Sequence, residues 1–262
     1  FDCTNGTFLW EQSCYALFDV ILEAREDGIN APRVCFMLPF AANSDSKQSL
    51  NNLYKRFYSK EKYQDLWFYW EGKPLIMAHP DNLSPESKRE KEILDFFTFR
   101  KNWAGYFDGD QSSEYWGWLS VYPQAKYLRP DGTVEQMTVG VAQNASEHGL
   151  VAMNDYRGGV YGRAYSSDID GKYSYTYTYR DSDITVDSDM ENAHYYGVNF
   201  QQQWDYALET DPTFIFVTGW NEWTMGRFET WQDSPNAFPD QFNDEYSRDC
   251  EPSKGDLKDF YY

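Results

Sequence analysis

Helix-like and strand-like stretches alternate along this chain. Apolar side chains recur at helical spacing over residues 13–27, and Gly28 follows where a helix would stop. The next segment, residues 33–40, is a short continuous apolar run, which indicates a strand buried on both faces. A helix from about residue 44, which Ser44 or Asp45 can cap, and a buried strand over residues 74–78 repeat this order.

Further elements follow the same pattern towards the C-terminus. They are a charged helix capped by Ser84 with Pro85 at its first position, strands at 96–99, 136–142 and 213–218, a short strand at 151–153, and a helix that ends at Asp211. Strands that alternate with helices at this spacing predict parallel strands joined by right-handed crossovers.

This order of elements predicts an α/β fold. A barrel is favoured over an open doubly wound sheet, because no glycine-rich phosphate loop follows a predicted strand. The chain opens at Phe1–Asp2 as if at the end of a strand, and only about six or seven of the eight strands of such a barrel are recognisable. We therefore expect a single (β/α)8 TIM-type barrel over residues 1–262. It would be truncated in this chain, with missing strands and further domains of a longer protein outside it.

An acidic insertion interrupts the alternation at about residues 155–198. Within it, residues 173–179 alternate with a period of two and place four tyrosines on one face. We interpret the insertion as a loop or small hairpin over the mouth of the barrel.

The charge balance excludes two classes of partner. The chain has 23 basic and 42 acidic side chains and a formal net charge of -19. Nucleic acids and anionic membrane surfaces would both be repelled, because each needs a basic patch. No apolar run approaches the roughly 20 residues that span a bilayer, so we expect no membrane insertion.

Aromatic residues point to a ligand class. Phe, Tyr and Trp make up 19% of the chain, although the mean hydropathy is -0.75. Flat amphipathic side chains suit ligands that have apolar ring faces and hydroxyl edges, as sugars do. The alternative for any single ring is that it fills the core.

Several polar residues lie where predicted strands end, which is where reactive groups stand in an α/β barrel. They are Asp2 and Asn5 after the first strand, His79 after the strand at 74–78, Gln143 and Asn144 after the strand at 136–142, and the run Thr218-Gly-Trp-Asn-Glu-Trp223 after the last strand. His79 is a candidate ligand for a sugar hydroxyl. Arg163 and Arg248 are candidates for binding substrate oxygens, or for pairing with carboxylates.

Glu222 is the strongest catalytic candidate. Trp220 and Trp223 flank it, and Asn221 precedes it. Apolar rings raise the pKa of a carboxyl group, and an adjacent amide can hold a substrate hydroxyl. Glycoside hydrolysis uses two carboxyl groups that flank the scissile bond. The structural alternative is a buried glutamate that acts as a hydrogen-bonded strut between loops.

The Asn221-Glu222-Trp223 motif resembles that of glycoside hydrolase family 99, the endo-α-mannosidases and endo-α-mannanases, and of related family-71-like barrel proteins. The helix segment 199–204 and the segment 240–249 are also similar to stretches in bacterial members of this group. The resemblance implies a TIM barrel in which Glu222 is the first catalytic carboxylate. The family's second carboxylate comes three residues later, where this chain has Met225.

A second carboxylate must therefore come from elsewhere if the protein cleaves sugars. Asp2 is our choice, because it also stands at a strand end; Asp108, Asp110, Asp155 and Glu229 are the alternatives. We expect no metal and no cofactor, since the three histidines are dispersed and Asp168-Ile-Asp-Gly171 lacks the acidic residue that closes a calcium loop. Calcium at that segment is the less favoured alternative.

These observations together predict a bacterial glycosidase that acts on a polysaccharide or glycan and is secreted, periplasmic or at the cell surface. The rival interpretation is a non-catalytic carbohydrate-binding barrel module, which Met225 favours.

Overall fold

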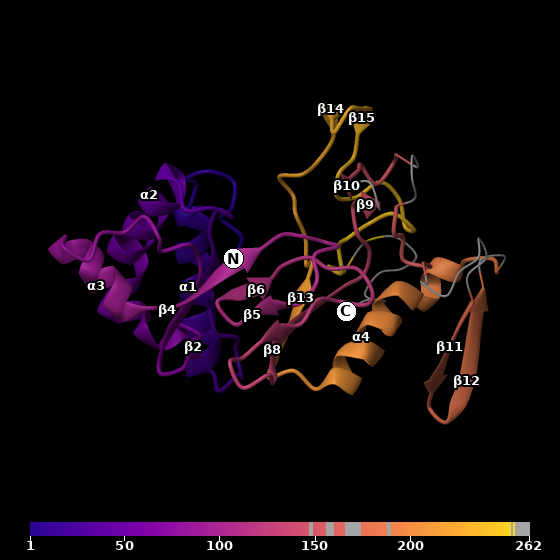
Figure 1. The fold of residues 1–262 in the computed structure, drawn as a ribbon, viewed down its shortest axis with the longest axis horizontal. Helices are drawn as coiled ribbons and strands as arrows, with labels where there is room; N and C mark the ends of the chain where they lie inside the picture. The colour runs from indigo at the N-terminus through magenta and orange to yellow at the C-terminus, as the bar shows by residue number, and fades with distance from the viewer. Residues whose placement is uncertain (147–148, 156–159, 166–173, 188–189, 253, 255–262) are drawn as a thin grey trace. The chain divides into compact units, whose positions relative to one another are not determined.

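The chain folds into two compact units in the computed structural model (Figure 1). Residues 1–146, 149–155, 160–165, 174–187, 190–252 and 254 are described. Unit 1 comprises Phe1–Trp103 and Ser113–Trp116, and unit 2 comprises Ala104–Ser112 and the chain from Gly117 onwards.

Unit 1 is built on parallel strands. The neighbours β1 (Phe36–Met37), β3 (Lys73–Met77) and β4 (Thr98–Trp103) are parallel, β6 (Tyr115–Gly117) follows β4, and β2 (Tyr69–Trp70) pairs with β3 antiparallel. Asp2 forms a parallel bridge with Met37. The start of the chain thus adds to the edge of this sheet, as the sequence predicts.

The helices of unit 1 are α1 (Glu11–Glu26), α2 (Ser44–Leu53) and α3 (Lys88–Phe96). Asn43, rather than Ser44 or Asp45, caps α2, because its side chain and Ser46 form a reciprocal capping box. The prediction of Ser84 as the cap of α3 is also wrong. Ser87 accepts from the amide of Glu90 and starts the helix three residues later.

Aromatic side chains fill the core of unit 1. Phe18 on α1 packs edge-on against Trp67 with ring centroids 5.5 Å apart, and Phe36 on β1 stacks on Phe57 at 5.6 Å. All four side chains are fully buried. Much of the aromatic excess in this half of the chain therefore stabilises the fold rather than binding a ligand.

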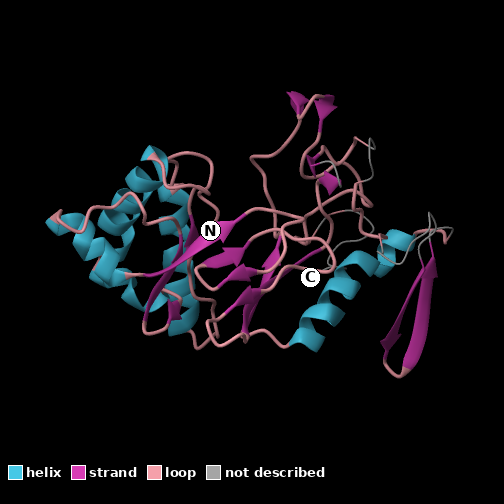
Figure 2. Cartoon of the chain, in the orientation of Figure 1, coloured by secondary structure: helices cyan, strands magenta, loops and turns pink. Residues whose placement is uncertain are grey.

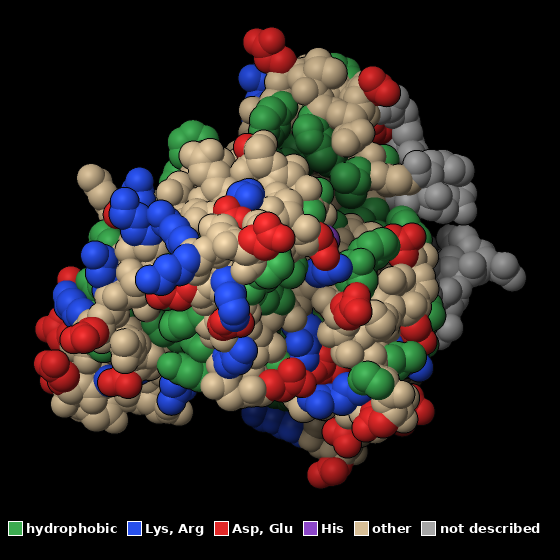
Figure 3. All heavy atoms as spheres, turned by 60° about the vertical axis from the view of Figure 1, so that its left-hand side comes forward, with side chains coloured by type: hydrophobic (Ala, Val, Ile, Leu, Met, Phe, Trp, Pro, Cys, Tyr) green, Lys and Arg blue, Asp and Glu red, His purple; other side chains and the backbone are tan. Residues whose placement is uncertain are grey.

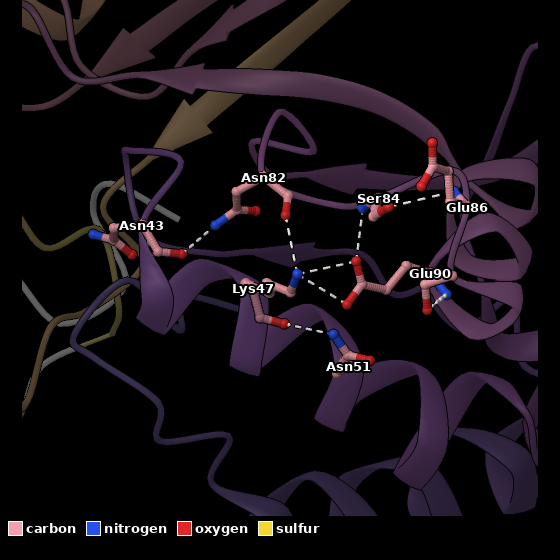
Figure 4. A network of polar contacts seen from close by, with 8 residues as sticks. Asn43, Lys47, Asn51, Asn82, Ser84, Glu86 and Glu90 are labelled. Carbon is pink, nitrogen blue, oxygen red and sulfur yellow. Dashed lines mark hydrogen bonds and ion pairs between the residues drawn. The ribbon is translucent and has the colours of Figure 1, made fainter.

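A polar network joins α2 to α3 (Figure 4). Lys47 on α2 forms an ion pair with Glu90 on α3, 2.9 Å from its Oε1, and donates to the carbonyl of Asn82 at 3.1 Å. Glu90 also accepts from the amide of Ser84 at 2.6 Å. This network ties the loop between β3 and α3 to both helices.

Unit 2 is centred on β8 (Val134–Gly140). This strand is parallel to β13 (Phe214–Thr218) and antiparallel to β7 (Tyr127–Leu128), which carries β5 (Gln111–Ser112) on its other side. Helix α4 (Val198–Thr210) packs on β8 (Figure 2). Its Ala207 meets Met137 and Val139 in a buried cluster. The predicted helix that leads into the last strand is thus confirmed.

Two-stranded ribbons make up most of the remaining strands of unit 2. They are β9 (Ala145–Ser146) with β10 (Gly149–Leu150), β11 (Ser174–Tyr179) with β12 (Ser182–Asp187), and β14 (Phe228–Trp231) with β15 (Ser234–Ala237). The β11–β12 hairpin contains most of the alternating tyrosine segment. The predicted strand at 151–153 is absent. Val151 and Ala152 lie outside any helix or strand, and Met153 begins a turn and donates its amide to the carbonyl of Phe238.

The fold is therefore mixed α/β with parallel strands in each unit, whereas a single TIM-type barrel over residues 1–262 stays a prediction. None of the helices that the structure describes is long and apolar enough to cross a bilayer. On the face drawn in Figure 3, acidic and basic side chains are interspersed over the surface.

Candidate functional site

The candidate site in unit 2 lies where β8 and β13 end. The two strands are parallel and in register through Gly140 and Thr218, so their carboxyl ends reach the same edge of the sheet. Asn144 follows β8 and Glu222 follows β13. This is the position at which α/β folds place reactive side chains.

A buried arginine holds the carboxylate of Glu222. Nη2 of Arg248 lies 2.5 Å from Oε2 of Glu222 and 2.9 Å from Oδ1 of Asp240. The two carboxylate oxygens share this nitrogen, so they are at most about 5.4 Å apart, the sum of those two distances. The side chain of Glu222 is 17% exposed, against 7% for Arg248 and 6% for Asp240. Of these three, only Glu222 reaches solvent to an extent that a substrate could use.

Tyr106 helps to fix the guanidinium, and Asn144 in turn holds Tyr106. The hydroxyl of Tyr106 is hydrogen-bonded to Arg248 and lies 2.5 Å from Oδ1 of Asn144. Burial alone would lower the pKa of Arg248, but Tyr106, Asp240 and Glu222 raise it above its ordinary value. Arg248 is therefore a permanent cation, and its charge favours the ionised form of Glu222.

Two backbone segments bring these residues together. The amides of Cys250 and Glu251 donate to the carbonyls of Gly219 and Trp220 at 2.7 Å and 3.0 Å. Gly219 has φ +100, and a Cβ there would lie 2.2 Å from the carbonyl oxygen of Arg248. Only glycine fits at this crossing, since it combines a left-handed backbone with the closest approach of the two segments.

A carboxylate lies beside Asn221 as well. Nδ2 of Asn221 donates to Oε2 of Glu251 at 3.1 Å. Met225 lies in a turn after Glu222, because its amide donates to the carbonyl of Glu222 at 2.8 Å. In the family that the Asn221-Glu222-Trp223 motif resembles, the second carboxylate stands at this position, where this chain has a thioether.

Two acidic groups behind the site have raised pKa values. Burial, and then repulsion from Asp240, raises the pKa of Asp249 to about 8. Burial raises the pKa of Glu245 to about 7, although the amide of Ala164 and the charge of Arg163 oppose the shift. Both groups retain their protons above the pH at which ordinary carboxyl groups lose them.

Arg163 and Gln143 are used to hold the protein together. Both are buried. Arg163 donates to the carbonyls of Ser247 and Asp249, and Gln143 accepts from Asn199 at 3.0 Å. Sequence analysis suggests substrate contacts for both residues, whereas in the structure they position the segment 245–249 and the end of β8.

The two tryptophans lie at the surface. Trp220 is 48% exposed and Trp223 is 78% exposed. The interpretation that apolar rings dominate the surroundings of Glu222 therefore needs correction, because the cation of Arg248 lies against this carboxylate. An exposed indole has a flat apolar face of the kind that stacks on a sugar ring.

The structure places Asp2, Asn5 and His79 in unit 1, whereas Glu222 belongs to unit 2. Asp2 accepts from the amide of Thr4 at 2.8 Å. His79 lies 3.3 Å from the carbonyl of Asn102, and burial lowers its pKa. A common site for these residues and Glu222 stays a prediction.

The alternative partners for Glu222 have other surroundings. Asp155 accepts from the hydroxyl of Ser234, and Asp110 accepts from the amide of Lys126 at 2.8 Å. The charge of Asp108 adds to the burial that raises the pKa of Tyr127. Glu229 is exposed on β14. None of these contacts involves Glu222. The sequence gives no local signal for Tyr106, Asp240 and Glu251, because their positions depend on contacts between loops.

Two hollows bear on where a ligand can bind. A cavity of about 10 Å³ beside Tyr106, Gln143 and Arg248 holds no more than a water molecule. A hollow of about 460 Å³ in unit 1 is lined mainly by aliphatic side chains, such as Val20 and Ile29, and its described lining contains no carboxyl group. Glu222 is not among the lining residues of either hollow.

Among the residues that the structure describes, no three His, Cys, Asp or Glu side chains are grouped as a metal site requires. The candidate calcium segment at 168–171 lies outside the described residues. No protein-family model, curated protein or solved structure matches this chain.

Proposed function

We propose that the protein is a glycoside hydrolase that acts on a polysaccharide or glycan, with Glu222 as one of two catalytic carboxyl groups. The observation that carries the proposal is the partly exposed carboxylate of Glu222 at the end of β13, held by the buried cation of Arg248. The exposed indoles of Trp220 and Trp223 next to it support a sugar as the ligand. Action outside the cytoplasm belongs to the same proposal.

The pairing with Arg248 suggests a role for Glu222. A carboxylate bonded to a permanent cation stays ionised, so Glu222 suits the part of nucleophile or general base rather than that of proton donor. An ionised carboxylate near the anomeric carbon also stabilises the positive charge that develops there as the glycosidic bond breaks.

A carbohydrate-binding module without activity is the second candidate. Met225 favours it, because the related family has a carboxylate at that position. Under this alternative, Glu222 accepts hydrogen bonds from sugar hydroxyls, and the indoles supply most of the affinity.

The direct test replaces Glu222 by glutamine and measures turnover against a panel of neutral and acidic glycans. If the protein is a hydrolase, we expect kcat of E222Q to be at least about a hundredfold below that of the wild-type protein. Glutamine neither attacks the anomeric carbon nor accepts a proton. The matched control is E209Q, since Glu209 is an exposed glutamate on α4. We expect E209Q to retain wild-type turnover. Wild-type turnover by E222Q, or sugar binding without turnover by the wild-type protein, would refute the hydrolase.

A further inference from the structure

The proposed hydrolase requires a second carboxyl group that Met225 does not supply. The thioether of Met225 has no proton to donate to a leaving group. The amide of Met225 donates to the carbonyl of Glu222, so this residue closes a turn directly after Glu222. Another segment of the chain must therefore supply the acid.

The segment 248–251 lies alongside the loop that carries Glu222. Backbone hydrogen bonds from Cys250 and Glu251 to Gly219 and Trp220 fix their relative positions. Three acidic side chains accompany this segment near the end of β13. Asp249 and Glu251 belong to it, and Asp240 is paired with its Arg248.

Exposure and bonding distinguish these three groups. Asp240 is buried and paired with Arg248, so it is not accessible to a substrate. Oδ1 of Asp249 is buried too, and its carboxyl group is hydrogen-bonded to Asp240. Glu251 is only partly buried, and Asn221 orients its carboxyl group at 3.1 Å. Of the three, Glu251 is the group that a bound sugar can touch.

We propose that Glu251 is the second catalytic carboxyl group and acts as the general acid, an inference that rests on the proposed hydrolase activity. The carboxyl group of Glu251 gives its proton to the glycosidic oxygen as the bond from that oxygen to the anomeric carbon breaks. A water molecule delivers hydroxide to the carbon, and its remaining proton passes through Glu222 back to Glu251. One glycosidic bond and one water molecule yield two hydroxyl groups, and both carboxyl groups return to their starting states.

The division of roles follows from the neighbours of each group. Arg248 bonds directly to Glu222 and stabilises its charged form, whereas the carboxyl group of Glu251 accepts a hydrogen bond from the neutral amide of Asn221. A neutral partner accommodates both the protonated and the ionised carboxyl group. Glu251 is therefore the better proton donor of the two, and Asn221 acts as its positioning residue.

The test compares two kinds of substrate. E251Q, E222Q and the exposed control E209Q are assayed on 2,4-dinitrophenyl α- and β-glycosides of glucose, mannose and galactose and on the corresponding disaccharides. Dinitrophenolate leaves without protonation, so the loss of a general acid affects these substrates little. We expect E251Q to lose roughly 10²–10⁴-fold in kcat/KM on the disaccharides and less than about tenfold on the dinitrophenyl glycosides. E222Q should lose activity on both kinds.

The outcomes separate this inference from the function on which it rests. If E222Q is inactive while E251Q retains wild-type rates on both kinds of substrate, or loses the same factor on both, the role of Glu251 is wrong and the hydrolase stands. If E222Q retains wild-type rates, or the wild-type protein cleaves neither kind, the hydrolase itself is wrong. Circular dichroism of E251Q shows whether it is folded, and the ratio between the two substrates of the same variant does not depend on the amount of folded protein.

Discussion

Arg248 decides how the site works, because one buried cation serves two carboxylates. Its guanidinium bonds Glu222 at the surface and Asp240 in the interior. Removing the arginine would leave Asp240 charged and unpaired in a buried position, which costs about 3–5 kcal/mol in comparable cases. Loss of activity in an Arg248 variant would therefore mix misfolding with chemistry, and milder substitutions around it are more informative.

Tyr106→Phe is such a substitution. The ring stays in place, but the hydrogen bonds to Arg248 and Asn144 are lost. We expect kcat to fall roughly tenfold with a smaller change in KM, because the guanidinium that orients Glu222 becomes less well fixed. Steady-state kinetics on the best substrate of the wild-type protein measure this split.

Tyr179→Phe is the matched control, since Tyr179 is an exposed tyrosine on β11. It should leave both constants unchanged. An unchanged kcat in Tyr106→Phe would show that Tyr106 fills space without positioning the arginine.

Asp249 links stability to pH. Its pKa is raised to about 8 by burial and by Asp240, whereas that of an unfolded aspartate is about 3.9. The folded state therefore binds this proton more tightly, and the stabilisation it provides is lost as the pH rises through about 8. Between pH 5 and pH 8, we expect the free energy of unfolding to fall by on the order of 2 kcal/mol more in the wild-type protein than in D249N.

Urea unfolding at the two pH values measures this difference, and D183N is the control because Asp183 is exposed on β12. Equal pH dependence in D249N and the wild-type protein would mean that Asp249 is ionised in the folded state at neutral pH.

Residue chemistry was only partly predictable from the sequence. Glu222, Asn221 and Arg248 were identified because they stand near a strand end or in a segment of suggestive composition, and the structure connects the first and third directly. Asp240 and Glu251 were not identified, since their proximity to the end of β13 depends on the crossing of two segments at Gly219. A contact between two irregular loops leaves no periodicity to detect.

At the scale of elements, helices and strands were predicted correctly where their buried residues recur with a regular spacing. The helix expected over residues 13–27 is α1 at Glu11–Glu26, and the strand expected over residues 213–218 is β13 at Phe214–Thr218. The prediction failed at caps and short strands, because the side chain that caps a helix is chosen by hydrogen-bond geometry rather than by periodicity. Asn43 and Ser87 are the examples.

The end of β13 provides a test at this scale. In Gly219→Ala, the new Cβ would meet the carbonyl oxygen of Arg248, and the left-handed backbone would be strained. We expect the variant to lose more than about 2 kcal/mol of stability, and its activity to fall because the segment 248–251 moves away from Glu222.

Gly226→Ala is the control in the same loop region, since a Cβ there meets nothing within 4 Å. It should stay within about 0.5 kcal/mol of the wild-type protein in thermal or urea unfolding. Equal stability of the two alanine variants would show that the two segments do not approach as closely as described.

At the scale of the whole molecule, charge and composition limit the substrate. A net charge of -19 repels polyanions, so a neutral glycan suits the protein better than a sulfated or uronic-acid-rich one. The alternation of helices and strands predicted a mixed α/β fold with parallel strands, which the structure shows in each unit. Closure into one barrel stays a prediction, because periodicity identifies strands without specifying which distant strands pair.

The central claim is that a sugar binds at Glu222, and a crystal structure of the inactive E222Q variant with a bound oligosaccharide tests it most directly. The ligand is the member of the glycan panel that binds this variant most tightly. The account predicts a sugar ring stacked on Trp220 or Trp223, with an anomeric carbon roughly 3–4 Å from the side chain at position 222 and the glycosidic oxygen within hydrogen-bond distance of Glu251. An oligosaccharide bound elsewhere, with position 222 and Glu251 in contact only with solvent and protein, would contradict it.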